Sequence, residues 1–482
     1  MPDGSALERL LEAARAHRAA GRADAARRAL ADLLDQHPDH AEALVEFIAA
    51  AVELGQPALA HARVASYIQA RPFASDMLRL FVQLSGALER WDDAATALEK
   101  LVLLETRDAV ARELQAARDE IRRTQAAGAP PGPSRAMTAG ARRRVLLVSL
   151  ASPPSITSFY ERAFRRHHDV VSVGPLRDRA FWEQYAEGLK GHAFYREGSA
   201  EAWVDACARL TEPCDIVTAP GFIDMRDVLT RLPAGFEPDL FVWVDQDRFT
   251  MPVRLDALGC PTVALMGDTH LGLEWRLRLA RGFDHVFVMF NRQHMAAFEH
   301  SGCPSVHWCP AAVDPDVHVA CGAGKVHDVT FVGSTHPQLH RARVERLRAL
   351  AAAGVDVFVD ARPLGAMTTL FAASRIVLND TVADDLNMRV FEALGSGSLL
   401  LTSRLPATSG LEDLFRDGEH LVLWDGTADL LEKIRYYLDE AHAGERERIA
   451  AAGQAEVLAR HTYDDRVAQV VAQVSRVDGL RP

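Results

Sequence analysis

Several features are scarce in this 482-residue sequence, and each scarcity argues against a class of protein. The longest apolar runs, such as Val145 to Leu150, are far shorter than the roughly 20 residues of a membrane-spanning helix, so we expect no membrane span. Lys and Arg number 54 against 66 Asp and Glu, which gives a net charge of −12. This balance argues against a general nucleic-acid binder, which needs a surplus of cations on the face that meets the phosphates. The first residues lack an apolar segment ending in small residues, which predicts a cytoplasmic rather than a secreted protein.

Cysteine is scarce too. The 6 cysteines form no C-x-x-C pair, and all of them lie beyond residue 200. This pattern indicates neither a zinc site nor a disulfide framework. Cys303 and Cys309 flank His307, but a fourth ligand and the tight spacing of zinc sites are missing. We therefore predict reduced cysteines that serve packing, and no bound metal or cofactor.

The first hundred residues repeat themselves at an offset of 34 residues, which is the TPR period. The recurring positions are a glycine (Gly21, Gly55), an alanine (Ala26, Ala60, Ala94) and a proline (Pro38, Pro72). Glycine permits the tight turn between paired helices, alanine lets the helices approach, and proline follows the second helix because it cannot continue it. The third copy has Glu89 and Thr106 at the glycine and proline positions. The spacing predicts about three TPR-like helical repeats; an unrelated alanine-rich helical bundle is the alternative.

From Arg143 the pattern changes to short apolar, β-branched runs separated by helical stretches, which is typical of buried parallel sheets with helices on both faces. The first series of runs is RVLLVSL, DIVTAPG, DLFVWVDQD, PTVALMGDTH and HVFVMF, and the second is DVTFVGS, VDVFVD, IVLND, SLLLTS and HLVLWDG. Two consecutive Rossmann-like domains are predicted. Ligands of such sheets bind outside the carboxyl ends of the strands, so we expect the active site in the cleft between the two halves.

These patterns define the predicted organisation of the chain. A stretch rich in Pro, Gly, Ser and Ala, without apolar periodicity, is expected to link the repeats to the sheets. The predicted parts are a repeat domain (1–128), the linker (129–142), an acceptor-side Rossmann-like domain (143–312), a donor-side Rossmann-like domain (313–465), and a C-terminal helix and tail (466–482).

The segment NDTVADDLNMRVFEALGSGSLLLTSRLP, residues 379–406, resembles the nucleotide-sugar site of group 1 glycosyltransferases, especially the branch named after the spore maturation protein CgeB. The resemblance continues through FRDGEHLVLWDGTADLLEKIRYYLDE to ARHTYDDRVAQVV. It covers roughly the last 155 residues well and the first Rossmann half in outline. It implies the GT-B architecture of two Rossmann-like domains facing a cleft, and a nucleotide-diphosphate sugar as donor.

Members of that family carry two acidic residues separated by seven positions, which correspond to Asp384 and Glu392 in this sequence. The resemblance implies that Glu392 accepts the two ribose hydroxyls of the donor with its two carboxylate oxygens. Asp384 stands where the family usually has glutamate. The resemblance assigns the sugar hydroxyls to Asp384 or to its neighbour Asp385.

A helix beginning near Asn387 is expected to direct its free N–H groups at the donor pyrophosphate, with Arg389 adding a planar cation. This arrangement replaces a metal ion. The alternative is an amphipathic helix on which Arg389 and Glu392 form a surface pair.

The second half offers further candidates after its first strand. Gly333 and Ser334 follow that strand, where a small residue lets the backbone approach a ligand closely. Arg341 and Arg343 lie on the next helix and are candidates for the diphosphate, although either one also suits a solvated helix face.

In the first half, the sequence GDTH places Asp268 and His270 directly after a buried strand. We predict that these two residues are catalytic, with His270 deprotonating the acceptor hydroxyl, because imidazole titrates near neutral pH. A packed loop histidine is the alternative. Ser155 and Thr157, after the first strand, are further candidates for contacting sugar or phosphate.

Two motifs imitate functional sites. DQD at 245–247 looks like a metal-binding D-x-D, but it follows a strand and is explained by carboxylates at the sheet edge. GAGK at 322–325 lacks the upstream glycine and the hydroxyl residue of a P-loop. We assign no function to either.

The sequence thus predicts a metal-independent glycosyltransferase that moves a sugar from a nucleotide-diphosphate sugar to an acceptor hydroxyl. The repeats are expected to recruit a protein acceptor or partner, or to form a homodimer. Two alternatives remain: a nucleotide-sugar epimerase of the same fold, and a non-catalytic scaffold whose transferase half is degenerate.

Overall fold

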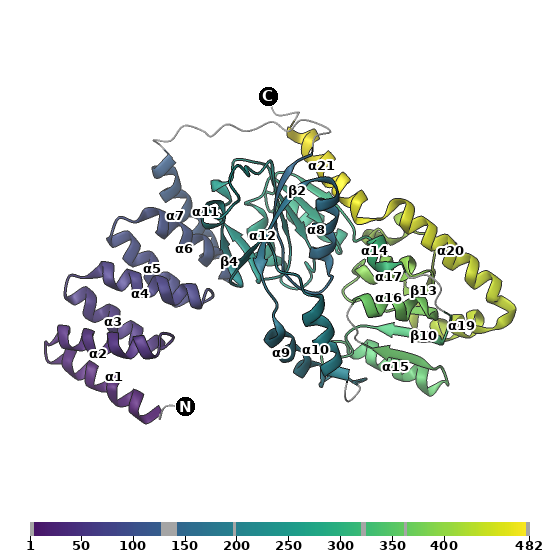
Figure 1. The fold of residues 1–482 in the computed structure, drawn as a ribbon, viewed down its shortest axis with the longest axis horizontal. Helices are drawn as coiled ribbons and strands as arrows, with labels where there is room; N and C mark the ends of the chain where they lie inside the picture. The colour runs from purple at the N-terminus through teal and green to yellow at the C-terminus, as the bar shows by residue number, and fades with distance from the viewer. Residues whose placement is uncertain (1–3, 127–141, 196–198, 320–323, 361–363, 479–482) are drawn as a thin grey trace. The chain divides into compact units, whose positions relative to one another are not determined.

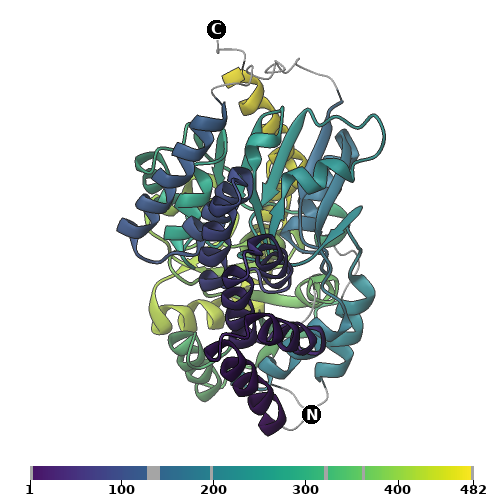
Figure 2. The ribbon, with the colours of Figure 1, turned by 90° about the vertical axis from the view of Figure 1, so that its left-hand side faces the viewer.

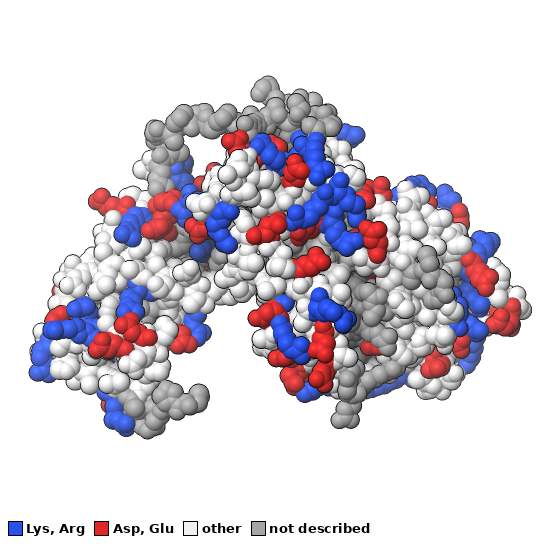
Figure 3. Space-filling model, viewed as in Figure 1, with Lys and Arg blue, Asp and Glu red and all other residues white. Residues whose placement is uncertain are grey.

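The computed structural model describes residues 4–126, 142–195, 199–319, 324–360 and 364–478, and the chain divides into two compact units, Met1–Gly132 and Pro133–Pro482. Among the helices described, none is long and apolar enough to cross a membrane. The predicted linker lies outside the described residues except for Arg142. Figure 3 shows basic and acidic side chains interspersed on one face of the described residues.

The described part of the N-terminal unit is all helical, and its helices follow one another in chain order (Figures 1 and 2). They are α1 (Gly4–Ala19), α2 (Ala23–Gln36), α3 (Ala41–Glu53), α4 (Pro57–Ala70), α5 (Ser75–Ala87), α6 (Trp91–Leu104) and α7 (Asp108–Ala126). The turns inside the first two helix pairs have Gly21 and Gly55 at φ +73° and +67°, and Glu89 takes φ +57° at the matching position of the third pair. The recurring alanines are the contact points of the pairs, since Ala26, Ala60 and Ala94 are at most 1% exposed. The prediction of helical repeats with a 34-residue period is confirmed, while recruitment of a protein partner stays a prediction.

The first half of the C-terminal unit is built on a seven-stranded parallel sheet with the order β3-β2-β1-β5-β7-β8-β9. Its strands are β1 (Arg144–Val148), β2 (Asp169–Pro175), β3 (Ile216–Thr218), β5 (Leu240–Val244), β7 (Thr262–Met266), β8 (His285–Val288) and β9 (Val306–Trp308), and β4 (Gly221–Asp224) pairs separately with β6 (Thr250–Val253). Its helices are α8 (Ile156–His167), α9 (Arg179–Leu189), α10 (Ser199–Leu210), α11 (Met225–Thr230), α12 (Leu273–Ala280) and α13 (Met295–His300). Short 3₁₀ turns occupy Leu255–Ala257 and Arg292–His294.

The second half carries a five-stranded parallel sheet with the order β11-β10-β12-β13-β14. Its strands are β10 (His327–Val332), β11 (Val357–Asp360), β12 (Ser374–Asn379), β13 (Leu399–Ser403) and β14 (Val422–Trp424). Its helices are α14 (Pro315–His318), α15 (Arg341–Ala352), α16 (Leu364–Ala372), α17 (Met388–Gly395), α18 (Leu411–Leu414), α19 (Gly426–Leu438), α20 (Ala443–Arg460) and α21 (Tyr463–Asp478), with 3₁₀ turns at Ala407–Ser409 and Glu440–His442. The prediction of an all-α repeat region followed by two Rossmann-like α/β halves is confirmed.

The last helix, α21, returns to the first half and packs against α8. Tyr463 at its start is fully buried, and its ring lies 5.2 Å from that of Phe159 and 5.1 Å from that of Tyr160. The backbone N–H of Val313 donates to His461 O at 2.9 Å, beside the connection between the halves. The two halves therefore share one apolar core, which fixes the loops of one sheet against those of the other.

Candidate active site

Loops from both halves meet at the carboxyl ends of β7, β8, β10 and β12. The N–H of Leu386, in the loop after β12, donates to Phe290 O, after β8, at 2.9 Å. The side-chain amide of Asn291 donates to Ala383 O at 3.4 Å. Because parallel strands end at one edge of each sheet, this contact gathers the predicted residues of both halves into one region.

Two arginines of the second half lie over the same aromatic ring. The guanidinium carbons of Arg343 and Arg389 lie 5.3 and 5.4 Å from the centre of the Phe331 ring. Gly333 makes this approach possible, because a Cβ at this position would lie 2.8 Å from Arg389 Nη2 and 3.2 Å from Phe331 Cζ. Asn379, fully buried on β12, orients Arg389 by accepting from its Nη1 at 3.3 Å.

This arginine pair, Arg343 and Arg389, is not neutralised by an ion pair with any carboxylate among the residues described. Arg343 donates instead to two backbone carbonyls, those of Ser334, at 3.0 Å, and of Asp380. Burial lowers the pKa of both guanidinium groups, that of Arg343 to about 10, and the charge of Arg389 adds to the shift of Arg343. The Nε atoms of both are buried without a hydrogen-bond partner. Arg343 is buried and Arg389 is partly exposed, and two adjacent cations with spare donors are suited to a polyvalent anion such as a diphosphate.

The two arginines predicted on α15 have different surroundings. Arg343 is 7% exposed and donates to Ser334 O, whereas the side chain of Arg341 is 84% exposed and pairs with Glu345 one turn later. The structure therefore places Arg343, and not Arg341, in the candidate site. Ser334 lies beside Gly333, and its Oγ is 3.5 Å from the N–H of His336.

Helix α17 begins beside the arginine pair, as the sequence predicts. Asn387 is its N-cap residue but makes no side-chain cap bond; its amide exchanges hydrogen bonds with Asn379 at 3.3 and 3.5 Å. Val390 N–H donates to Asn387 O at 3.3 Å, so the N–H groups of Met388 and Arg389 are the ones that remain available to an anion.

Glu392 lies one turn into α17, and its side chain is 6% exposed. Burial raises its pKa to about 7, although the nearby charge of Arg389 opposes the shift. His318 Nε2 lies 3.8 Å from Glu392 Oε1, and His318 Nδ1 accepts from the N–H of Asp314 at 2.8 Å. Because burial lowers the pKa of His318 to about 4, the ring is neutral and its single proton is on Nε2, facing Glu392. The surface-pair alternative for Glu392 is therefore wrong; its contact with ribose stays a prediction.

Asp384 and Asp385 are adjacent but differ in burial, since Asp384 is exposed and Asp385 is buried. Ala383 and Asp384 both adopt φ +53°, and this left-handed turn leaves Asp384 exposed. Asp385 is 7% exposed, and burial raises its pKa to about 6. Of the two carboxylates offered by the sequence, Asp385 is the one that faces the first half.

His270 is oriented by Asn291, a fully buried residue that sequence reasoning did not identify. Asn291 Oδ1 lies 3.3 Å from His270 Nδ1 and accepts from Thr269 Oγ1 at 3.2 Å. Since Asn291 donates to Ala383 O with its nitrogen, its oxygen faces His270, so Nδ1 of His270 carries the proton in this bond. Nε2 is then the basic nitrogen. The geometry suits a general base whose tautomer is fixed by its neighbour.

Asp268, His270 and Asp385 come together across the two halves, with one ligand atom of each within 4.8 Å of the others. Burial among the surrounding loops raises the pKa of Asp268, although its side chain reaches solvent. In the part of the chain that is described, no other group of three His, Cys, Asp or Glu residues is as close. The absence of a metal from the reaction stays a prediction, and these three residues are where a cation would bind.

Asp245 of the D-x-D motif forms a structural ion pair with Arg276. Asp245 is 4% exposed and accepts from Arg276 Nε at 2.6 Å, and Arg276 also donates to Leu271 O. The pair therefore supports the loop that carries His270, which agrees with the interpretation of DQD as sheet-edge carboxylates. Asp247 is exposed, at φ +54°.

The remaining candidates have local roles. Ser155 is the N-cap of α8, in a capping box with Ser158, and its Oγ lies 3.1 Å from Thr157 Oγ1. Of GAGK, residues 322 and 323 lie outside the described part, and Lys325 donates to Ala372 O and Ser398 Oγ at 2.9 and 2.7 Å. The contact of Ser155 and Thr157 with a sugar or phosphate stays a prediction.

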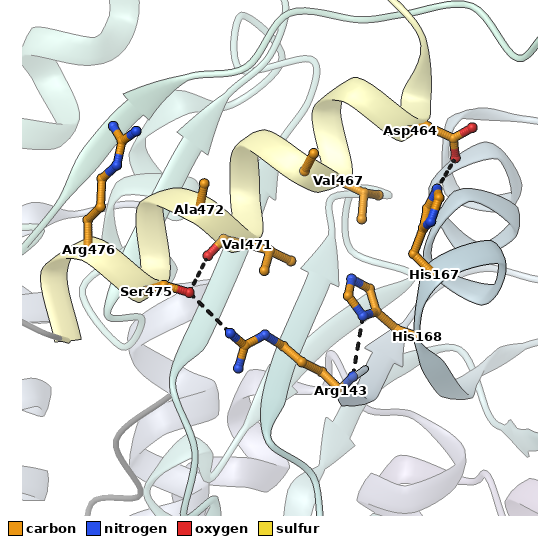
Figure 4. A pocket seen from close by; sticks show the side chains of 10 residues that line it. Arg143, His167, His168, Asp464, Val467, Val471, Ala472, Ser475 and Arg476 are labelled. Carbon is orange, nitrogen blue, oxygen red and sulfur yellow. Dashed lines mark hydrogen bonds and ion pairs between the residues drawn. The ribbon is translucent and has the colours of Figure 1, made fainter. Parts of the chain in front are cut away.

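A pocket of about 590 Å³ lies elsewhere, between α21 and the end of α8 (Figure 4). Its lining is Arg143, His167, His168, Asp464, Val467, Ala468, Val471, Ala472, Ser475 and Arg476. No predicted site residue lines it. Figure 4 shows that α21 contributes its apolar side chains, whereas His167 pairs with Asp464 at 3.3 Å.

Part of the second half matches a family of known proteins. Residues 327–472, which include the arginine pair and Glu392, match a family model described as glycosyl transferase-like. No curated protein sequence matches the chain. The segment from β10 into α21 is therefore glycosyltransferase-like.

Several solved structures are similar to the chain at low sequence identity. An O-GlcNAc transferase mutant from Thermobaculum terrenum is 14% identical with a TM-score of 0.42, covering 99% of this chain and 98% of that chain. Sucrose-phosphate synthase from Thermosynechococcus elongatus is 11% identical with a TM-score of 0.43, covering 70% and 100%. Anabaena HepE in complex with UDP and glucose is 15% identical with a TM-score of 0.44, covering 69% and 100%.

Proposed function

We propose that this protein is a metal-independent glycosyltransferase that transfers a sugar from a nucleoside-diphosphate sugar to an acceptor hydroxyl. The observation that carries the proposal is the arginine pair over Phe331, which has no ion-pair partner among the described residues and lies inside the glycosyl transferase-like segment. Two cations beside one ring repel each other, and an anion bound next to both of them relieves that repulsion.

The donor would lie along the edge of the second half. Arg343, Arg389 and the first N–H groups of α17 hold the pyrophosphate, and Gly333 leaves room for it. Glu392 accepts the ribose hydroxyls. In place of a divalent cation, these fixed donors stabilise the charge that develops on the leaving pyrophosphate.

The first half would supply the base. The acceptor oxygen forms its bond to the anomeric carbon as the bond from that carbon to the pyrophosphate oxygen breaks. The acceptor proton passes to Nε2 of His270, and the nucleoside diphosphate leaves with the electron pair of the broken bond. Asp268 and Asp385 lie close enough to stabilise the imidazolium that results.

Release of nucleoside diphosphate tests this proposal. With a panel of nucleoside-diphosphate sugars and saccharide acceptors, we expect acceptor-dependent release that changes less than about twofold in EDTA, because arginines and helix N–H groups replace the metal. Interconversion of donors without an acceptor would instead indicate an epimerase, and the absence of any donor binding would indicate a non-catalytic scaffold.

Loss of turnover in EDTA that Mn²⁺ restores would contradict the metal-independent mechanism. Asp245 is engaged by Arg276, so the ligands would then be sought at Asp268, His270 and Asp385. Single Asp268→Asn and Asp247→Asn variants separate the two sites, because only the first would raise the Mn²⁺ concentration required.

Donor affinity is expected to depend on pH through Glu392. With a pKa of about 7, raised by burial, this carboxyl is roughly one-tenth ionised at pH 6 and nine-tenths ionised at pH 8. Only the ionised form accepts both ribose hydroxyls, so affinity should rise about tenfold between these pH values and then level off. Calorimetric titration of Glu392→Gln should give a weaker affinity without that rise; an unchanged rise would assign it to another group, such as Asp385.

A further inference from the structure

A cluster of aromatic side chains lies on α9 and α10 of the first half, two helices that pack side by side (Figure 1). We call it the aromatic platform; it consists of Phe181, Trp182 and Tyr185 on α9, Trp203 on α10, and Phe249 before β6. The rings of Tyr185 and Trp203 stack with their centres 5.3 Å apart and their planes at 16°. Tyr185 is nevertheless 52% exposed. An ordered, parallel pair of rings that stays open to solvent is suited to contact a ligand.

Arg177, directly after β2, lies among these rings. Its guanidinium carbon is 4.7 Å from the centre of Phe181, 5.3 Å from that of Phe249 and 5.6 Å from that of Trp182. It forms no ion pair with a carboxylate among the described residues, and its Nε is buried without a hydrogen-bond partner. Burial lowers the pKa of this guanidinium to about 10. The aromatic faces hold the cation in place while its hydrogen-bonding edge remains unused.

Arg179, two residues from Arg177, is a solvent-exposed arginine that forms ion pairs. Its side chain is 54% exposed and pairs with Glu183 at 2.9 Å and with Asp205 at 2.8 Å. Acidic partners are therefore present on both α9 and α10, yet neither of them reaches Arg177.

The platform lies on the same sheet edge as His270. The N–H of Arg177 donates to Ala151 O, after β1, at 2.9 Å, so Arg177 is fixed at the carboxyl end of β2. From β2 to β7 the sheet order passes through β1 and β5, which is three strand spacings, or roughly 14 Å at about 4.8 Å each. A ligand chain of a few units that reaches His270 would extend over the platform.

We propose that the platform is a distal acceptor subsite for an acidic saccharide, with Arg177 binding a carboxylate or phosphate of the acceptor and Tyr185 and Trp203 contacting a neighbouring sugar ring. The inference rests on the proposed function and adds the acceptor class. A saccharide fits better than a peptide, because the platform presents flat rings beside the cation of Arg177, whereas an extended peptide needs unpaired backbone groups to bind.

Intrinsic tryptophan fluorescence of the full-length protein provides the test, since Trp182 and Trp203 lie within the platform. Glucuronate and glucose 6-phosphate are expected to change the fluorescence with saturation, whereas glucose gives no response at the same concentrations. Arg177→Gln should weaken both acidic sugars tenfold or more, and Arg177→Lys should restore part of the affinity. Arg179→Gln is the matched control and should bind as the wild type does.

The two acidic sugars separate the carboxylate from the phosphate as the group recognised, and a response to either one supports the subsite. Equal binding of glucose, unchanged affinity in Arg177→Gln with an unchanged melting temperature, or preference for a glutamate-rich hexapeptide would each overturn the proposal. The assay needs no turnover, and donor affinity measured by calorimetry should be the same in Arg177→Gln and the wild type. Failure of the subsite and failure of the glycosyltransferase proposal are therefore distinguishable.

Discussion

Arg389→Ala is expected to lower kcat/KM for the nucleotide-sugar donor by about 10²–10³-fold, because removing one preorganised donor to a developing charge costs roughly 2.7–4 kcal/mol. Arg389 lies between Phe331 and Asn379 and against Gly333 in the candidate site. Steady-state release of nucleoside diphosphate gives the rate, and calorimetry gives the affinity for the unreactive nucleoside diphosphate. Arg389→Lys should recover part of the loss, because it keeps the charge but not the planar fork.

Arg341→Ala is the matched control for this experiment. It removes an arginine of the same neighbourhood whose side chain is 84% exposed and paired with Glu345, so kcat/KM should stay within about twofold. Melting temperatures of both variants show whether the fold persists. Wild-type activity of Arg389→Ala in a folded protein, or an equal loss in Arg341→Ala, would remove the arginine pair from the donor site.

The fold could be predicted from the sequence wherever a buried element shows a recognisable pattern of apolar residues. All five strands of the second sheet coincide with β-branched runs, because parallel strands covered on both faces are apolar throughout. Strand β2 was missed, since Ser172 interrupts its apolar run and Pro175 ends it. The short β9, partly exposed along its length, and the separate pair of β4 and β6 gave no comparable signal.

Glu89 shows how a repeat keeps its geometry after the sequence signal has weakened. The third helix pair turns at φ +57° with glutamate where the first two have glycine. A non-glycine residue in this region is tolerated at a cost because the stacked helices on either side determine the turn. The sequence alone indicated divergence at this position, whereas the structure shows the same turn.

Site residues were harder to predict because a motif fixes position along the chain but not the direction of a side chain. Arg341 and Arg343 are two residues apart and therefore lie on nearly opposite sides of α15. The signal that separates them was present, since Arg343 precedes the buried Leu347 and Leu350 by four and seven residues. For Asp384 and Asp385 no such signal existed, because the left-handed turn that exposes Asp384 is not marked by a glycine.

Contacts between the two halves of the C-terminal unit could not be predicted from the sequence of either half alone. Asn291 follows β8 in the first half and binds Ala383 of the second, and the same side chain orients His270. The aromatic platform was missed as well, because its rings come from three segments and only the packing of α9 on α10 brings them together.

His270→Ala is expected to lower kcat by about 10²–10³-fold while the KM for the donor changes less than about threefold. A positioned general base contributes about 10²–10⁴ in rate, and the donor contacts lie on the other half of the site. His300→Ala is the control, because His300 is exposed on α13 and its Nδ1 bonds only to the local Ala296 O. Asn291→Ala, which leaves the imidazole in place but removes the acceptor for its Nδ1 proton, should lose about tenfold in kcat.

The double variant His270→Ala/Asn291→Ala decides whether the two residues act as a unit. If Asn291 acts only through His270, the double variant should be no slower than His270→Ala alone. Once the imidazole has been removed, Asn291 has no base left to orient. Additive losses would mean that Asn291 instead maintains the contact between the halves through Ala383. A kcat in His270→Ala within threefold of the wild type would move the role of base to one of the two neighbouring carboxylates, Asp268 or Asp385, because burial raises the pKa of both.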